Sequence, residues 1–157
     1  MKNLFAHSFL AKASLVTLLF TGIFAVSAKA GLDSYEIYLN NKLLIRQTVA
    51  GPIDLKNLPL GDAKASDNLV IRYSQCNAPN KIGKNRSISV RDADGKIVKE
   101  WKFKDSDGSN TAMTIPVKEL LEIQNKSNGA LSFHYSADGM QKTQKLAALQ
   151  PGKKNNT

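Results

Sequence analysis

The sequence predicts an all-β protein with one short helix, folded as an antiparallel two-sheet β-sandwich or a partly barrel-like variant of it. About seven short runs alternate apolar and polar residues, as half-buried strands do, and clusters of Asn, Asp and Gly separate them. After residue 30, one stretch has the apolar spacing of a helix, and it begins at Pro116. The chain has one cysteine and one tryptophan, so it lacks the cysteine–tryptophan–cysteine core of antibody domains, and only the architecture is predicted.

The clearest element is a hairpin over residues 86–104, in which apolar residues alternate with polar ones on both sides of an Asp/Gly cluster at 92–95. A four-residue loop pairs Val90 with Ile97 and leaves Lys99 as the one misfit on the inner face. This register puts five apolar side chains on that face, those of Ile88, Val90, Ile97, Trp101 and Phe103. We expect the core to form around this tryptophan.

The remaining elements follow from the same alternation. Asparagine tolerates positive φ, so Asn40 and Asn41 predict a tight turn between the first two strands. Pro116 opens the helix, which Gly129 ends after about two turns and which must pack across an open end of the sheets to be stable. The other strands are expected at 35–39, 43–49, 68–76, 112–115, 131–135 and 142–149, with a short strand or an irregular apolar crossing at 53–60.

Residues 1–30 are expected to be a secretory signal peptide, which makes the protein exported, either periplasmic or secreted. Lys2 and Lys12 precede an apolar run at 13–26 that is short for a bilayer span, and Ala-Lys-Ala at 28–30 is a small-x-small cleavage site. The alternative is a retained membrane anchor. Cleavage leaves one β-sandwich domain at 31–150 and a polar tail at 151–157 that we expect to be disordered.

The charge balance of the exported part favours anionic partners. Of the 22 Lys and Arg residues, three lysines lie in 1–30, and with 13 Asp and Glu residues the remainder carries a net charge of +6. Such a surplus suits an envelope protein or an anionic glycan, and it is equally the ordinary solubility charge of a small domain. One cysteine cannot form an internal disulfide. We expect no cofactor and no transmembrane segment after cleavage.

Cys76 and His134 are candidates for chemistry, because they are the only cysteine and the only histidine after residue 30. A thiolate activated by an imidazole is a nucleophile, and both side chains are metal ligands. No sequence spacing links the two residues, a nucleophile usually needs a third orienting group, and a metal needs at least three ligands. The alternative is a half-buried thiol and an unrelated surface imidazole.

The loop at 77–86 is the most suggestive surface. Lys81, Lys84 and Arg86 bring three cations together with several amides, a combination that can hold a phosphate, sulfate or carboxylate. Its single glycine before a lysine is not a phosphate-binding P-loop. No aromatic side chain lies among the cations, which argues against nucleic acid as a ligand. A merely solvated loop is the alternative.

Two Asp/Gly clusters, at 92–95 and 105–110, contain part of the EF-hand calcium pattern. When either glycine is aligned with the sixth position of that loop, two required carboxylates are missing, including the bidentate glutamate. We therefore predict hairpin turns here and no metal site, with loose binding of a cation by the acidic residues as the alternative.

Several stretches resemble a group of small exported proteins of Bacteroidetes bacteria: DSYEIYLNNKLL near the start, YSQC at the end of a strand, WKF in the central hairpin, and IPVKELL. Together they cover most of the chain after residue 30, and none is a catalytic signature. The resemblance implies a location in the bacterial envelope. Members of the group often carry histidine immediately before the cysteine, where this chain has Gln75.

These observations favour a non-catalytic exported binding or interaction domain that uses the 77–86 loop. The first alternative is a cysteine-dependent enzyme or metal-binding protein that uses Cys76 with His134. The second is a structural subunit that assembles through an edge strand, because an open sandwich leaves strand edges available.

Overall fold

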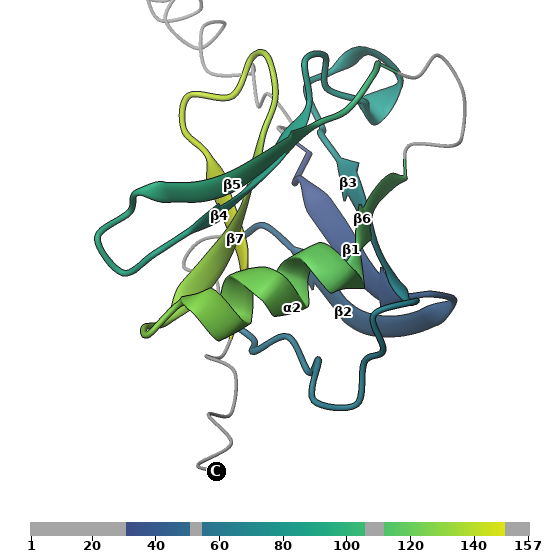
Figure 1. The fold of residues 1–157 in the computed structure, drawn as a ribbon. Coiled ribbons are helices and arrows are strands. Elements are labelled where there is room, and N and C mark those ends of the chain that lie inside the picture. The colour runs from purple at the N-terminus through teal and green to yellow at the C-terminus, as the bar shows by residue number, and fades with distance from the viewer. Residues whose placement is uncertain (1–30, 51–54, 106–111, 150–157) are drawn as a thin grey trace, which may run out of the picture. The chain divides into compact units, whose positions relative to one another are not determined.

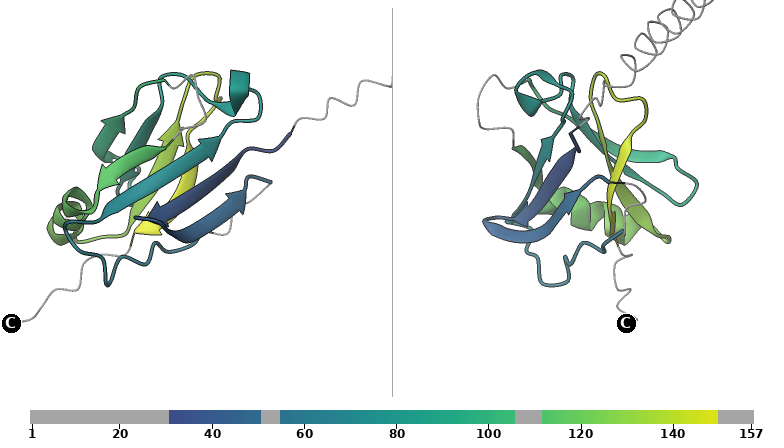
Figure 2. Two further views of the ribbon diagram at one scale, coloured as in Figure 1. Left: turned by 90° about the vertical axis from the view of Figure 1, so that its right-hand side faces the viewer. Right: turned by 180° about the vertical axis from the view of Figure 1, so that it is seen from behind.

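Two antiparallel four-stranded sheets face each other in the computed structural model, which describes residues 31–50, 55–105 and 112–149 (Figures 1 and 2). The strand orders are β2-β1-β3-β6 and β5-β4-β7-β8. The predicted β-sandwich is confirmed, and within these residues the sheets do not close into a barrel. The elements are β1 (Ser34–Leu39), β2 (Lys42–Thr48), β3 (Asn68–Ser74), η2 (Pro79–Lys81), β4 (Ser87–Arg91), β5 (Ile97–Lys102), β6 (Met113–Pro116), α2 (Val117–Lys126), β7 (Leu131–Ser136) and β8 (Gln144–Leu149). The expected signal peptide at 1–30 and tail at 151–157 lie outside the described residues.

The first sheet follows the alternation of the sequence closely. Asn40 has a φ of 53° in the tight turn between β1 and β2, as the asparagine pair predicts. Leu69, Ile71 and Tyr73 of β3 are buried, whereas Arg72 between the last two is exposed. The predicted apolar crossing is irregular: in its described part Leu58 and Leu60 are buried, with one isolated bridge to β8. Ile53 lies outside the described residues.

The central hairpin forms in the second sheet, but the predicted register is wrong. Val90 pairs with Lys99 and Arg91 with Ile97, because a bulge interrupts the ladder between Val90 and Arg91. The side chain of Asp92 accepts hydrogen bonds from the backbone N–H groups of Asp94 and Lys96, at 3.1 and 2.9 Å. These bonds fix the turn beyond the bulge, and Ile97, expected inside, is 48% exposed.

The core is centred on stacked tyrosines rather than on the tryptophan. Tyr73 of β3 stacks on Tyr135 of β7 across the two sheets, with ring centroids 4.0 Å apart, and Tyr35 stacks beside Tyr73 at 6.3 Å. The hydroxyl of Tyr35 donates to the backbone oxygen of Leu146 at 2.6 Å. Trp101 is only half-buried at the margin of this core, so the expectation of a core around it is wrong.

Helix α2 leads from β6 to β7 across one end of the sandwich (Figure 1). Pro116 is its N-cap rather than its first residue, and the helix is ten residues long, longer than the predicted two turns. Glu119 accepts a hydrogen bond from the Trp101 indole and pairs with Lys99, each at 3.0 Å. The apparent misfit of Lys99 on the inner face is thus explained by an acidic partner on the helix.

Candidate functional site

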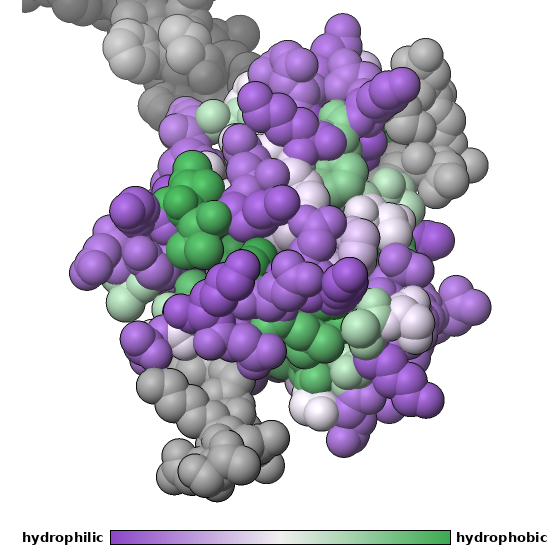
Figure 3. Space-filling view, in the orientation of Figure 1, coloured by the Kyte–Doolittle hydropathy of each residue, from purple (hydrophilic) through white to green (hydrophobic). Residues whose placement is uncertain are grey.

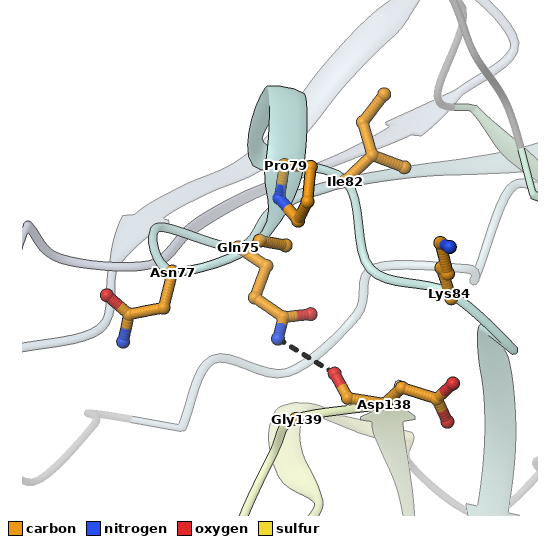
Figure 4. Close-up of a pocket in the computed structure, with 8 residues that line it drawn as sticks. Gln75, Asn77, Pro79, Ile82, Lys84, Asp138 and Gly139 are labelled. Atoms are coloured by element: carbon orange, nitrogen blue, oxygen red, sulfur yellow. Dashed lines mark hydrogen bonds between the residues drawn. The ribbon is translucent and has the colours of Figure 1, made fainter.

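A pocket of about 260 Å³ lies beside the predicted contact loop, at the end of β3 far from α2 (Figure 4). The position follows from the sheet register, because Asn68 at the start of β3 pairs with Pro116, next to α2, and the pocket residues follow Ser74 at the other end. Figure 4 shows the loop on one side and the turn after β7 on the other. The pocket is lined by Gln75, Asn77, Ala78, Pro79, Ile82, Lys84, Asp138 and Gly139.

Gln75 forms the floor of this pocket and is only 5% exposed. Its Nε2 donates to the backbone oxygen of Asp138 at 3.0 Å, whereas its Oε1 is buried and has no hydrogen-bond partner. Gly83 covers this oxygen so closely that a Cβ at that position would collide with Oε1 and would lie 2.9 Å from the hydroxyl of Tyr135. That hydroxyl is also buried without a partner. Two unsatisfied oxygens therefore lie beneath one glycine.

The loop that carries the pocket contains three residues with positive φ. Asn80, Lys81 and Asn85 have φ values of 53°, 60° and 50°, in the left-handed region that side chains other than Asn and Asp rarely adopt. The loop is tied to the β7–β8 turn: Asn85 Nδ2 donates to Asp138 Oδ2 at 2.7 Å, and the Asp138 N–H donates to the Lys84 oxygen at 2.9 Å. Asparagine adopts the left-handed region readily, so the strain is confined to Lys81.

Two of the three predicted cations lie on the surface and the third does not. Lys81 and Lys84 are exposed, and Lys84 lines the pocket. Arg86 is 3% exposed, and its Nη2 donates to the backbone oxygen of Lys104 at 2.7 Å. The expectation that Arg86 binds a partner at the surface is therefore wrong. Its guanidinium instead joins the two strands of the central hairpin, just beyond their paired residues.

Cys76 and His134 are not brought together. On β7, Phe133 and Tyr135 point into the core, so His134 between them points to the outer face of its sheet. Cys76 follows β3 in the other sheet, where its N–H donates to Asp33 Oδ1 at 2.8 Å and the backbone of Gly31 lies against its sulfur. The imidazole therefore points to the outer face of the second sheet, whereas the thiol follows a strand of the first sheet, and the contacts of these two described residues do not join them.

His134 has a different partner, which the sequence analysis missed. Its Nε2 lies 3.0 Å from the hydroxyl of Ser132, two residues earlier on the same face, while its Nδ1 is buried without a hydrogen-bond partner. Burial, and then the charges of Arg91 and Lys145, lower the pKa of His134 to about 4. The imidazole is therefore neutral at pH 7. The two-residue spacing of Ser132 and His134 could have predicted this contact, because residues two apart in a strand lie on the same face.

The described residues contain no group of three His, Cys, Asp or Glu side chains placed to hold a metal ion. The turn at 92–95 is explained by the hydrogen bonds of Asp92, and most of the cluster at 105–110 lies outside the described residues. Within the same ranges, no helix combines the length and apolar character needed to cross a membrane.

Comparisons of the chain with protein-family models, with curated proteins and with solved structures give no match. Function is therefore inferred from the residues around the pocket.

Proposed function

We propose that this chain is a non-catalytic binding domain exported to the bacterial envelope, and that it contacts an anionic partner through the loop at 77–85. The observation that carries the proposal is the pocket beside Gln75, which has an exposed lysine at its rim and the side chain of Gln75 in its lining. Pockets with a few converging polar groups are the usual places where proteins bind ligands. The partner is an envelope protein or an acidic glycan, as the positive net charge suggests.

The separation of Cys76 from His134 weighs against the cysteine-dependent alternative, because neither side chain has the other as an activating group. The Ser132–His134 contact does not replace that pair. Ser132 is only 8% exposed, and the second imidazole nitrogen has no orienting partner, which a catalytic serine–histidine arrangement uses to fix the tautomer.

The proposal can be tested by capture from bacterial envelope extract and by binding to acidic polysaccharides. The variant to compare with wild type is Lys81→Ala combined with Lys84→Ala. A matched control combines Lys42→Ala with Lys118→Ala. Both lysines are exposed and lie outside the loop, and replacing them lowers the net charge by the same amount. We expect the loop variant to lose the partner and the control to retain it. Equal retention by both variants would refute the assignment of the loop.

A second candidate function, self-assembly through an edge strand, is favoured by one observation. β5 is an edge strand of its sheet, and Ile97 and Val98 on it are 48% and 47% exposed. Figure 3 shows an apolar area over this strand. An exposed apolar edge is a template for pairing with a second copy of the chain. Sedimentation of wild type and of Val98→Lys distinguishes the two functions, because self-assembly requires a wild-type dimer that this charge disrupts.

A further inference from the structure

We propose that the pocket beside Gln75 binds the C-terminal residue of a peptide or protein whose main-chain carboxylate is free and whose last side chain is apolar. The inference rests on the proposed function, because it names the partner of the same surface. Three features lead to it: an apolar wall of the pocket, a cation at its rim, and a hydrogen-bond acceptor without a donor that lies beside the pocket under Gly83.

The apolar wall favours a hydrocarbon side chain. Ala78, Pro79 and Ile82 line one side of the pocket, which at about 260 Å³ is smaller than the sites that hold drug-sized ligands. An aliphatic side chain can fill such a space and leave the rest of its chain in solvent. A sugar ring carries hydroxyl groups on most of its carbons, and several of them would face this wall without a hydrogen-bond partner. An acidic glycan is therefore the less favoured ligand for the pocket.

The cation at the rim is suited to the carboxylate. Lys84 is exposed and lines the pocket from the side opposite Asn77 (Figure 4). Asp138, the acidic residue of the lining, accepts a hydrogen bond from the side-chain amide of Asn85 through one carboxylate oxygen, at 2.7 Å. A lysine is a point charge with three donors, so it can pair with a carboxylate in several orientations. Asn77 offers a further amide donor at the pocket.

The amide oxygen of Gln75 is suited to the peptide N–H. In the last residue of a peptide, the N–H nitrogen is bonded to the Cα that carries both the carboxylate and the side chain. A single residue therefore supplies the N–H, the carboxylate and the apolar side chain. Gln75 Oε1 is held in place because Nε2 of the same amide donates to Asp138. Gly83 covers Oε1, so the peptide N–H reaches it when the segment around Gly83 moves outward. The movement is favoured because Gln75 Oε1 has no hydrogen-bond donor in the free protein and gains one when the peptide is bound.

The test uses acetylated tetrapeptides that end in leucine, with either a free carboxylate or a C-terminal amide, titrated into isotopically labelled protein and followed by NMR. The side-chain NH₂ signals of Gln75 report directly on its amide. We expect the free-carboxylate peptide to shift these signals together with the backbone signals of residues 77–85. We expect amidation to weaken binding about tenfold or more, because it removes a charge-assisted contact.

Two lysine-to-methionine variants distinguish binding in the pocket from nonspecific electrostatic attraction to the loop. Lys84→Met should weaken binding of the free-carboxylate peptide about as much as amidation does, whereas Lys81→Met, outside the pocket lining, should change it less than about twofold. Lys84→Arg should retain most of the affinity. Equal binding of amide and carboxylate peptides would overturn the proposal, and so would equal effects of the two methionine variants, or binding of digalacturonate in preference to the peptide.

Failure of the C-terminal ligand can be distinguished from failure of the proposed function. If no peptide binds while the Lys81 and Lys84 double-alanine variant still loses its envelope partner, the C-terminal ligand is wrong and the loop remains the contact surface. If that variant keeps its partner and no peptide binds, both are wrong.

Discussion

Acidification should destabilise this domain through a single histidine. His134 is the only histidine after residue 30, and burial lowers its pKa in the folded state to about 4 from an ordinary value of 6.5. The folded state therefore disfavours the charged imidazole, whereas the unfolded chain accepts the proton freely. His134 therefore does not reduce the free energy of unfolding above about pH 6.5, and it reduces that free energy progressively as the pH falls from 6.5 towards 4.

The magnitude follows from the size of the shift. A shift from 6.5 to 4 corresponds to about 2 kcal/mol of lost stability at pH 5 if it is taken at face value. Because the side chain is half-buried and solvent screens part of the effect, we expect about 1 kcal/mol between pH 7 and pH 5. For a domain of this size that corresponds to a fall of about 4 °C in Tm.

The assay is urea unfolding of wild type and His134→Gln at pH 7 and pH 5. Glutamine keeps a polar group near Ser132 but does not titrate, so its stability should change much less over this range. The lowered carboxyl pKa values of Glu36, Asp67 and Glu119 act below about pH 4.5, and they act in both proteins. Equal losses in the two proteins, or an imidazole that titrates near pH 6.5 by NMR, would refute the reasoning.

Three further substitutions test the packing, and a fourth serves as a control. Arg86→Met removes a buried guanidinium that bonds the Lys104 oxygen, and we expect a loss of about 1–3 kcal/mol in urea unfolding. Tyr73→Leu removes the ring at the centre of the tyrosine stack and should lower the free energy of unfolding by about 2–4 kcal/mol, measured in the same way. Gly83→Ala should lower Tm, because its Cβ has no room, whereas Gly61→Ala, with nothing within 4 Å, should leave Tm nearly unchanged.

The sequence predicted the elements of this fold better than the contacts between them. The alternation of β3 placed Leu69, Ile71 and Tyr73 inside without any knowledge of a partner, because the period of a strand is a local property. The hairpin register was wrong because the bulge beside Val90 depends on side-chain bonds within the turn, which the alternation does not encode.

Long-range packing decided the features that the sequence did not predict. The position of the core depends on which aromatic rings meet across the sheets, and Tyr73 and Tyr135 are 62 residues apart. The contact that Arg86 makes is less distant, since Lys104 follows 18 residues later in the same hairpin, but it depends on the pairing of the two strands. For the site, the cationic loop was predicted, but Gln75 was noted only as the residue before the cysteine. A polar residue directly after a buried strand was the available signal.

The pocket and the core share a structural element, and this has a consequence for ligand binding. Gln75 comes two residues after Tyr73, which stacks on Tyr135, and the hydroxyl of Tyr135 lies under the same Gly83 that covers the Gln75 oxygen. Outward movement of Gly83 therefore uncovers two buried oxygens at once, one on the floor of the pocket and one at the end of the tyrosine stack. A ligand that donates to the first and admits water to the second satisfies groups that the free protein leaves without partners. Binding at the loop should then shift the NMR signals of the Tyr135 ring, which a ligand held only by the exposed lysines would not do, although either ligand would raise Tm.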